Sequence, residues 1–176
     1  MLEAPPQATL QKYWQVPDFT LTERSGKPFG RAYLLGHVWI GAFVYTTCPG
    51  PCGTMTSRLA TLDKALAAKP DVRIAAFTLD PETDTPEVLS RYATERIASE
   101  RWLFLTGERT AIHKLAFDGF KLSVQDRQAG AEPIIHSTKI ALVDKAGFVR
   151  GFYEGTANDG NESLLADIEK LRREQP

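Results

Sequence analysis

The chain has 176 residues, 43% of them hydrophobic, and a formal net charge of −1. This size suits one domain with a core large enough to fold without disulfides. The near-neutral charge gives no electrostatic basis for binding nucleic acid. The longest apolar run, residues 38–44, is shorter than the roughly 20 residues of a membrane-spanning helix. The first residues also lack the basic start and apolar stretch of a signal peptide, so the chain reads as a soluble cytosolic protein or as the soluble part of a longer precursor.

We expect residues 1–17 to form an irregular lead-in and residues 18–176 to form a single domain. Tyr13, Trp14 and Val16 are expected to hold the lead-in against that domain. Residues 18–22 alternate between polar and apolar, which indicates a half-buried strand, and a turn follows at 25–28. The nearly continuous apolar run at 38–45 is typical of a strand covered on both faces.

Further along the chain, apolar residues at helical spacing predict a helix over 53–68, and a second buried strand is expected at 72–79. Thr85 is a good N-cap with Pro86 at the first helical position, and the helix they start is expected to carry Leu89, Tyr92 and Ile97. The remaining expected elements are a strand at 102–105, a helix at 112–117, a polar loop at 121–135, a hairpin of 139–143 with 148–153, and a helix at 161–174. This alternation predicts an α/β fold with helices on both faces of a mostly parallel sheet, made mixed by the late hairpin.

The two cysteines of the chain, Cys48 and Cys52, are separated by three residues and follow the first buried strand. In open α/β sheets, sites form at the carboxyl ends of the strands. Cys52 is expected at a helix start, where the partial positive charge favours thiolate. The prolines stiffen the loop between the cysteines, and Gly50 is expected to permit its turn. An ordinary buried or disulfide-bonded pair is the alternative for two cysteines without context.

His136 lies before the hairpin and is a third candidate ligand. Two thiolates and an imidazole suit copper, as Cu(I) or Cu(II), better than structural zinc, which normally takes four ligands. His37 is expected to be structural, and His113 to be solvated on a helix. Asp80 follows the second buried strand in the acidic stretch 80–86, whose simplest role is to begin a capped helix. Asp80 could still orient a metal ligand without binding the metal itself.

From about residue 18 to its end, the chain resembles the Sco/SenC family of copper chaperones for cytochrome c oxidase assembly. The resemblance rests on the order and spacing of several motifs: DFTL at 18–21, SGK at 25–27, TCPGPC at 47–52, LDPETDTP at 79–86, LTG at 105–107, HST at 136–138, and LVD at 142–144 with Gly147. It implies a thioredoxin-like, three-layer α/β/α fold with Cys48, Cys52 and His136 as copper ligands. It also implies a cytochrome c oxidase subunit or another copper protein as partner. The expected location is the periplasm or the mitochondrial intermembrane space, with a membrane anchor outside this chain.

Two positions depart from the family pattern. Gly53 stands where proline usually follows the second cysteine, and Ile135 where aspartate usually precedes the histidine. The first change is expected to loosen the helix start, and the second removes a partner for the His136 ring.

Two other functions remain open from the sequence. If Cys48 and Cys52 are redox-active, the protein is a thiol–disulfide oxidoreductase acting on an oxidase subunit or another partner, although thioredoxins place two residues between their cysteines. A peroxiredoxin-like peroxidase fits less well, because Tyr45 and Gly41 occupy the positions of that family's threonine and proline.

Overall fold

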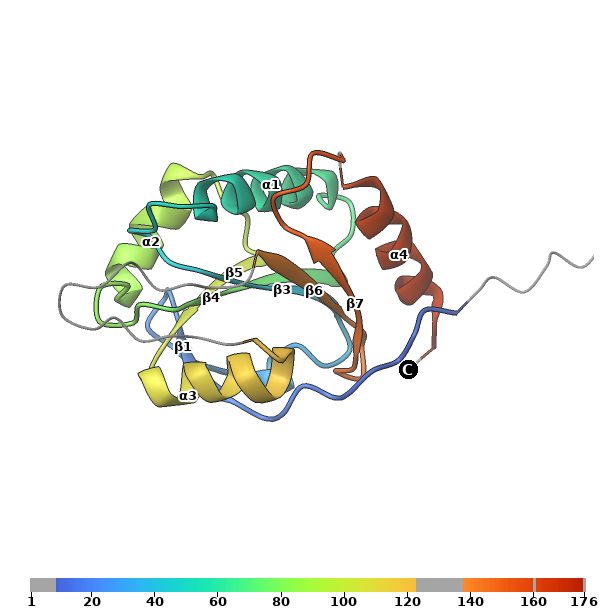
Figure 1. Ribbon diagram of the computed structural model, residues 1–176, viewed down its shortest axis with the longest axis horizontal. Helices are drawn as coiled ribbons and strands as arrows, with labels where there is room; N and C mark the ends of the chain where they lie inside the picture. Colours follow the sequence, from blue (N-terminus) through green and yellow to red (C-terminus); the bar gives the residue numbers. More distant parts are fainter. Residues whose placement is uncertain (1–8, 123–137, 160, 176) are drawn as a thin grey trace, which may run out of the picture.

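The structure is a computed structural model that describes residues 9–122, 138–159 and 161–175. A seven-stranded mixed sheet with the order β2-β1-β5-β4-β3-β6-β7 forms its centre. Helices cover both faces of this sheet, with α1 and α3 on opposite sides (Figure 1). The predicted α/β class, with a mixed sheet, a late hairpin and a closing helix, is confirmed.

The elements have the following bounds. The strands are β1 (Thr20–Glu23), β2 (Pro28–Gly30), β3 (Val38–Val44), β4 (Val72–Thr78), β5 (Trp102–Thr106), β6 (Lys139–Val143) and β7 (Val149–Glu154). The helices are α1 (Cys52–Ala65), α2 (Pro86–Glu95), α3 (Arg109–Lys114), α4 (Glu162–Arg173), the short 3₁₀ helix η1 (Arg31–Tyr33) and the π-helix η2 (Leu115–Gly119).

Strands β3, β4 and β5 are parallel neighbours at the middle of the sheet. Every residue of β3 is buried, as its unbroken apolar sequence predicts for a strand covered on both faces. The connections through α1 and α2 both step in the same direction along the sheet, so right-handed crossovers place both helices over one face. Strand β6 pairs antiparallel with β3 on its other side. The loops that leave β3, β4 and β5 therefore meet at one edge of the sheet.

An aromatic layer fills the space between the sheet and the α3 face. Phe77 of β4 contacts four other rings there, with centroid distances of 5.1 Å to Phe43, 5.7 Å to Phe19, 5.9 Å to Phe120 and 6.5 Å to Trp39. Gly41 makes room for this layer, because a Cβ at that position would lie 2.9 Å from the Phe120 ring. The layer anchors β3 and β4, whose ends carry the loops described below.

Helix α2 begins as predicted and ends earlier than predicted. The Thr85 hydroxyl accepts a hydrogen bond from the backbone of Val88, and Pro86 is the first helical residue. The placement of Ile97 in this helix is wrong. Ile97 lies beyond the helix end with a φ of 54° and is 82% exposed, and the Ala98 N–H closes the helix on the Ala93 carbonyl (3.0 Å). Glycine or asparagine usually occupies such a left-handed position, so an isoleucine there gives no stop signal.

Three further elements differ from the expectations. The helix expected at 112–117 begins at Arg109 and continues as the π-helix η2, and its Phe117 is 64% exposed. The short strand β2 was not predicted; it pairs antiparallel with β1, which itself pairs antiparallel with β5. The loop expected at 121–135 lies largely outside the described residues.

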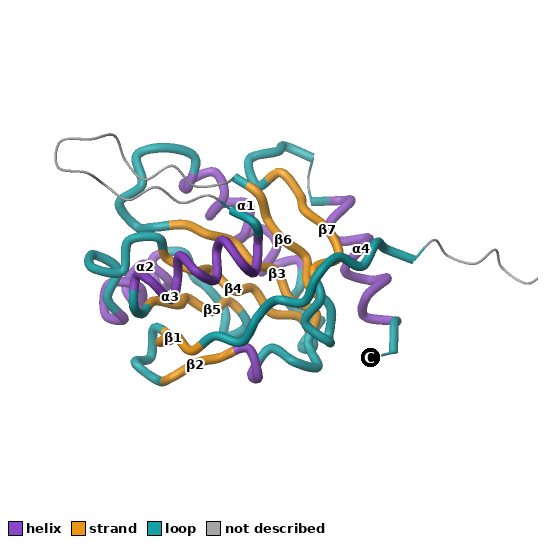
Figure 2. Tube along the Cα trace, turned by 60° about the horizontal axis from the view of Figure 1, so that its bottom comes forward, coloured by secondary structure: helices purple, strands orange, loops and turns teal. Residues whose placement is uncertain are grey.

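The described part of the lead-in, residues 9–17, runs along the edge of the sheet beside β7 (Figures 1 and 2). The Tyr13 N–H donates to the Val149 carbonyl and the Val149 N–H to the Trp14 carbonyl, both at 2.9 Å. Val16 is fully buried, and the Trp14 indole donates to the Gly119 carbonyl (2.8 Å). Arg150 of β7 binds the carbonyls of Leu10 and Gln11, at 2.8 and 3.0 Å. The segment thus covers the outer edge of β7 at its first residues.

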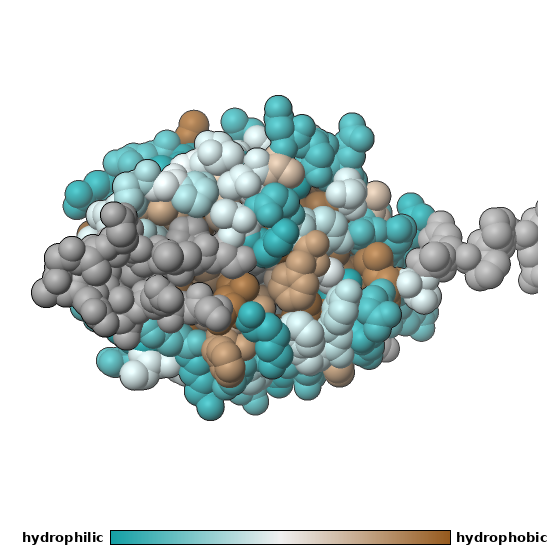
Figure 3. All heavy atoms as spheres, viewed as in Figure 1, coloured by the Kyte–Doolittle hydropathy of each residue, from teal (hydrophilic) through white to brown (hydrophobic). Residues whose placement is uncertain are grey.

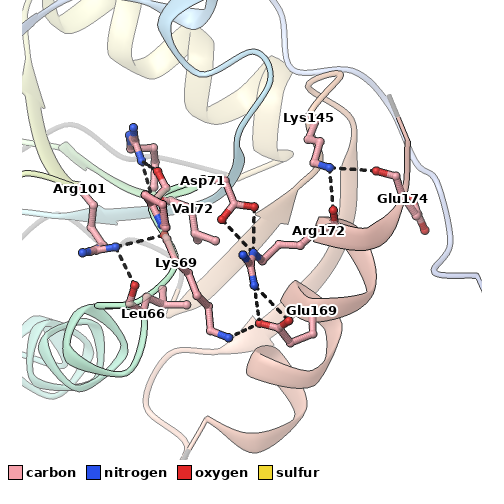
Figure 4. A network of polar contacts seen from close by, with 11 residues as sticks. Leu66, Lys69, Asp71, Val72, Arg101, Lys145, Glu169, Arg172 and Glu174 are labelled. Carbon is pink, nitrogen blue, oxygen red and sulfur yellow. Dashed lines mark hydrogen bonds and ion pairs between the residues drawn. The ribbon is translucent and has the colours of Figure 1, made fainter.

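Helix α4 is fixed by ion pairs to the loop between α1 and β4 (Figure 4). Arg172 donates from Nε to both carboxylate oxygens of Asp71 at 2.9 Å, and Lys69 pairs with Glu169. Lys145 of the β6–β7 turn donates to the Arg172 and Glu174 carbonyls at 2.7 and 3.0 Å. These contacts hold the closing helix at the end of the sheet opposite the cysteines.

On the face shown in Figure 3, hydrophilic side chains occupy most of the margin, and hydrophobic ones lie in small groups toward the middle. No helix in the described residues combines the length and hydrophobicity needed to cross a membrane.

Candidate metal and thiol site

The cysteines lie in the loop after the carboxyl end of β3, the first of the parallel strands. Cys48 is half-buried in the loop after β3, and its N–H donates to the Tyr45 carbonyl (3.3 Å). Cys52 is the first residue of α1 and is 2% exposed. Neither cysteine is in a disulfide, and their side chains are joined by a hydrogen bond. The two sulfurs therefore converge on one point, as the sequence predicts.

The conformation of the loop between the cysteines corrects one expectation. Gly50 is not among the glycines with positive φ, so the turn does not depend on glycine there. Gly53 was expected to loosen the start of α1. The helix begins at Cys52, immediately before Gly53, and open space surrounds the position of a Cβ at Gly53. The backbone at Gly53 can thus accept a larger side chain.

The expectation that the helix start favours a Cys52 thiolate is wrong for the metal-free protein. Burial raises the pKa of the Cys52 thiol well above its ordinary value, and the hydrogen bond between the Cys52 thiol and the Cys48 sulfur adds to this effect. A helix N-terminus contributes only a fraction of a charge, whereas removing a thiolate from water costs more. Cys52 is therefore protonated at neutral pH until a metal or a reaction partner displaces its proton.

The two thiols should differ strongly in reactivity, because Cys48 is partly accessible and Cys52 is buried and protonated. We expect iodoacetamide at pH 8 to label Cys48 at least about tenfold faster than Cys52. Mass spectrometry of peptides from a time course measures both rates. The Cys48→Ser variant is the control, since Cys52 should stay slow in it. Equal labelling of the two residues in the native protein would contradict this geometry.

His136, together with its neighbour Ile135, lies outside the described residues. Among the residues that are described, no group of three or more His, Cys, Asp or Glu side chains could hold a metal ion. The described chain resumes at Thr138, whose carbonyl accepts a hydrogen bond from Gly155 (2.6 Å). A Cβ at Gly155 would lie 3.1 Å from Met55. Thr138 therefore lies beside the first turn of α1, which begins at Cys52.

The other two histidines do not join the cysteines. His37 precedes β3 and Cys48 follows it, so the two residues lie at opposite ends of this strand. A seven-residue strand is about 23 Å long. His113 is half-buried on α3, over the opposite face of the sheet from α1 (Figure 1).

Asp80 lies at the same edge of the sheet as the cysteines and is 5% exposed. Its N–H donates to the Thr78 hydroxyl (3.0 Å), and its carbonyl accepts from Thr83 and Asp84 at 3.2 and 2.8 Å. These bonds form the turn that leads into α2, which is the structural role expected for the acidic stretch. A contribution of the Asp80 carboxylate to metal binding stays a prediction.

Asp84 was not singled out from the sequence, and it is the fully buried carboxylate of this edge. It accepts hydrogen bonds from the Thr46 N–H (3.0 Å), the Thr46 hydroxyl and the Thr78 hydroxyl (2.6 Å). The sequence offers two signals for Asp84: its place in the LDPETDTP motif at 79–86, and threonines near the ends of two adjacent buried strands.

The model of the SCO1/SenC family matches residues 7–173. A SCO1/SenC family lipoprotein from Bacillus anthracis is 32% identical, covers 94% of this chain and 100% of its own, and superposes with a TM-score of 0.86. BsSco, described with a disulfide switch as a member of the Sco family of cytochrome c oxidase assembly proteins, is 31% identical over 96% of this chain and 100% of its own, with a TM-score of 0.84. Yeast Sco1, solved with copper bound, is 22% identical over 93% and 92% of the two chains, and its TM-score of 0.76 shows a shared fold.

Proposed function

The chain belongs to the SCO1/SenC family, and we propose that it is a copper-binding metallochaperone for assembly of the copper site of cytochrome c oxidase. Cys48, Cys52 and His136 are the proposed ligands. The observation that carries this proposal is the pair of thiols in mutual contact in the loop after β3. Soft thiolates and an imidazole are ligands that copper prefers, and copper is bound in the yeast relative of the same fold.

The position of Thr138 supports the inclusion of His136. Strand β6 runs antiparallel to β3, so its first residue lies nearest the end of β3 from which the cysteine loop departs. Thr138 lies beside the first turn of α1. A two-residue segment spans at most about 7 Å, so this position of Thr138 is compatible with His136 as the third ligand.

Copper uptake by this pair requires the loss of thiol protons. Because burial raises the pKa of Cys52, protons compete with the metal, and the affinity for copper rises with pH. A loop with one half-buried and one buried sulfur leaves an accessible side for a copper donor or acceptor. This arrangement suits a protein that transfers copper rather than one that stores it.

Family membership and the lipoprotein relative support a location outside the cytoplasm with a membrane anchor.

The test is copper binding by the reduced protein and its His136→Ala variant. We expect one copper per chain, and an affinity about a hundredfold lower in the variant, since even partners that only orient a ligand can contribute tenfold to a hundredfold. His113→Ala is the matched control and should bind like the parent protein. Absence of copper uptake by the reduced protein, or equal affinities of parent and His136→Ala, would overturn the proposal.

A second candidate function is thiol–disulfide exchange with a partner. The contact between the two thiols favours it, as does the disulfide switch described for BsSco. This activity needs both cysteines and no imidazole. Reduction of a disulfide-bonded substrate should therefore be retained in His136→Ala and lost in Cys48→Ser, which separates the two functions.

A further inference from the structure

Asp84 occupies an unusual environment for a carboxylate. Its side chain is fully buried, and its three hydrogen-bond partners are neutral groups, two from Thr46 and one from Thr78. Burying a carboxylate costs free energy, which its hydrogen bonds offset. The backbone of Asp84 is itself fixed, because its N–H donates to the Asp80 carbonyl (2.8 Å).

The partners of Asp84 define what it holds in place. Thr46 is two residues before Cys48, and both its N–H and its hydroxyl are bound, which sets the direction in which the chain leaves β3. Thr78 is the last residue of the neighbouring strand β4. Asp84 thus joins the cysteine loop to the end of β4 and to the start of α2. Tyr92 of α2 lies near both Asp84 and Cys52, and its hydroxyl is 3.2 Å from the Thr56 hydroxyl of α1.

We propose that Asp84 is a positioning residue that holds Cys48 against Cys52, so that the two sulfurs are already arranged for copper or for disulfide formation. The inference deepens the proposed function by naming the group that arranges two of its ligands. Asp84 acts through Thr46, and this role requires no contact between its carboxylate and the metal.

Two substitutions of Asp84 separate the effect of its hydrogen bonds from the effect of its charge. In Asp84→Asn, the amide oxygen can accept from the Thr46 N–H and the Thr78 hydroxyl, while the amide nitrogen donates to the Thr46 hydroxyl, which can serve as acceptor. Asparagine therefore keeps the three bonds and removes the charge. Asp84→Ala removes all three bonds and releases the loop.

The test uses the metal-free protein equilibrated with reduced and oxidised glutathione. In this reaction the two protein thiols give two electrons and two protons to oxidised glutathione, so that one protein disulfide and two reduced glutathione molecules form. The equilibrium constant reports how well the two sulfurs are arranged. We expect Asp84→Ala to lower it about tenfold, which raises the reduction potential by about 30 mV. Asp84→Asn should stay within about threefold of the parent.

Asp63→Ala is the matched control. Asp63 is also a buried aspartate, bound to Ser99 (2.8 Å) and Arg101 (3.1 Å), but it lies 11 residues beyond Cys52 on α1. This variant should lower stability without changing the glutathione equilibrium. If Asp84→Ala does not fold, Thr46→Val is a milder variant that removes only the hydroxyl bond. We expect it to lower the glutathione equilibrium constant about threefold.

Two outcomes would overturn the inference. The glutathione equilibrium constant could change equally in Asp84→Ala and Asp63→Ala, or equally in Asp84→Asn and Asp84→Ala. Failure of the parent protein to bind copper would contradict the proposed function alone, because the glutathione equilibrium is measured without copper.

Discussion

Replacing Cys52 with serine is expected to lower the affinity for Cu(I) by about a thousandfold, or roughly 4 kcal/mol. Serine fits the space of the buried cysteine, but its hydroxyl is a hard, protonated group that does not replace a thiolate on copper. Cys52 is the first residue of α1, and serine is common at helix starts, where its hydroxyl can bond the backbone, so the protein should still fold. Competition with a chromophoric Cu(I) chelator measures the affinity.

Met55→Leu is the control for this experiment. Met55 is a buried sulfur-containing residue on the same helix, three positions after Cys52. Its thioether is also a soft group, so the control tests whether any nearby sulfur suffices. We expect Met55→Leu to bind copper like the parent protein. A Cys52→Ser variant with unchanged affinity would show that the metal binds elsewhere.

Replacing Phe77 with alanine is expected to lower the free energy of unfolding by about 4 kcal/mol, the usual cost of removing a buried phenylalanine. Phe77 is fully buried and contacts four aromatic rings, so the deleted ring leaves a cavity that its neighbours can fill only in part. For a chain of this size the loss corresponds to a decrease in Tm of roughly 8–16 °C. Guanidinium denaturation followed by circular dichroism measures it.

Phe117→Ala is the matched control, because Phe117 is 64% exposed on η2. This substitution should change the free energy of unfolding by no more than about 0.5 kcal/mol. If Phe77→Ala unfolds the protein, Phe77→Leu gives a smaller cavity and a measurable loss of stability. Comparable stabilities of the Phe77→Ala and Phe117→Ala variants would contradict the packing described for the aromatic layer.

The sequence predicted most of the fold because the central elements carry strong local signals. The unbroken apolar run of β3 and the Thr85-Pro86 start of α2 are such signals, and both are found in the structure. The end of α2 could not be predicted, since an isoleucine takes the left-handed position that normally marks a helix stop. Strand β2 is only three residues long and begins with a proline, which gives too short a pattern to recognise.

The places of Cys48 and Cys52 were predictable from the sequence, whereas their energetics were not, and His136 lies outside the described residues. The position of Cys48 and Cys52 after a buried strand indicates a pocket at the edge of the sheet, and the sulfurs do meet there. The protonation of Cys52 depends on how deeply the fold buries it, and sequence alone does not give that depth. The part played by Asp84 depends on Thr46 and Thr78 reaching one edge together, which follows from the pairing of β3 with β4.

The most direct test of the copper site is X-ray absorption at the copper edge of the loaded protein, measured for the parent and for His136→Ala. We expect two sulfur ligands and one imidazole nitrogen in the parent, and two sulfurs without the imidazole contribution in the variant. A parent spectrum with sulfur ligands but no imidazole, or identical spectra for the two proteins, would contradict a copper site built from Cys48, Cys52 and His136.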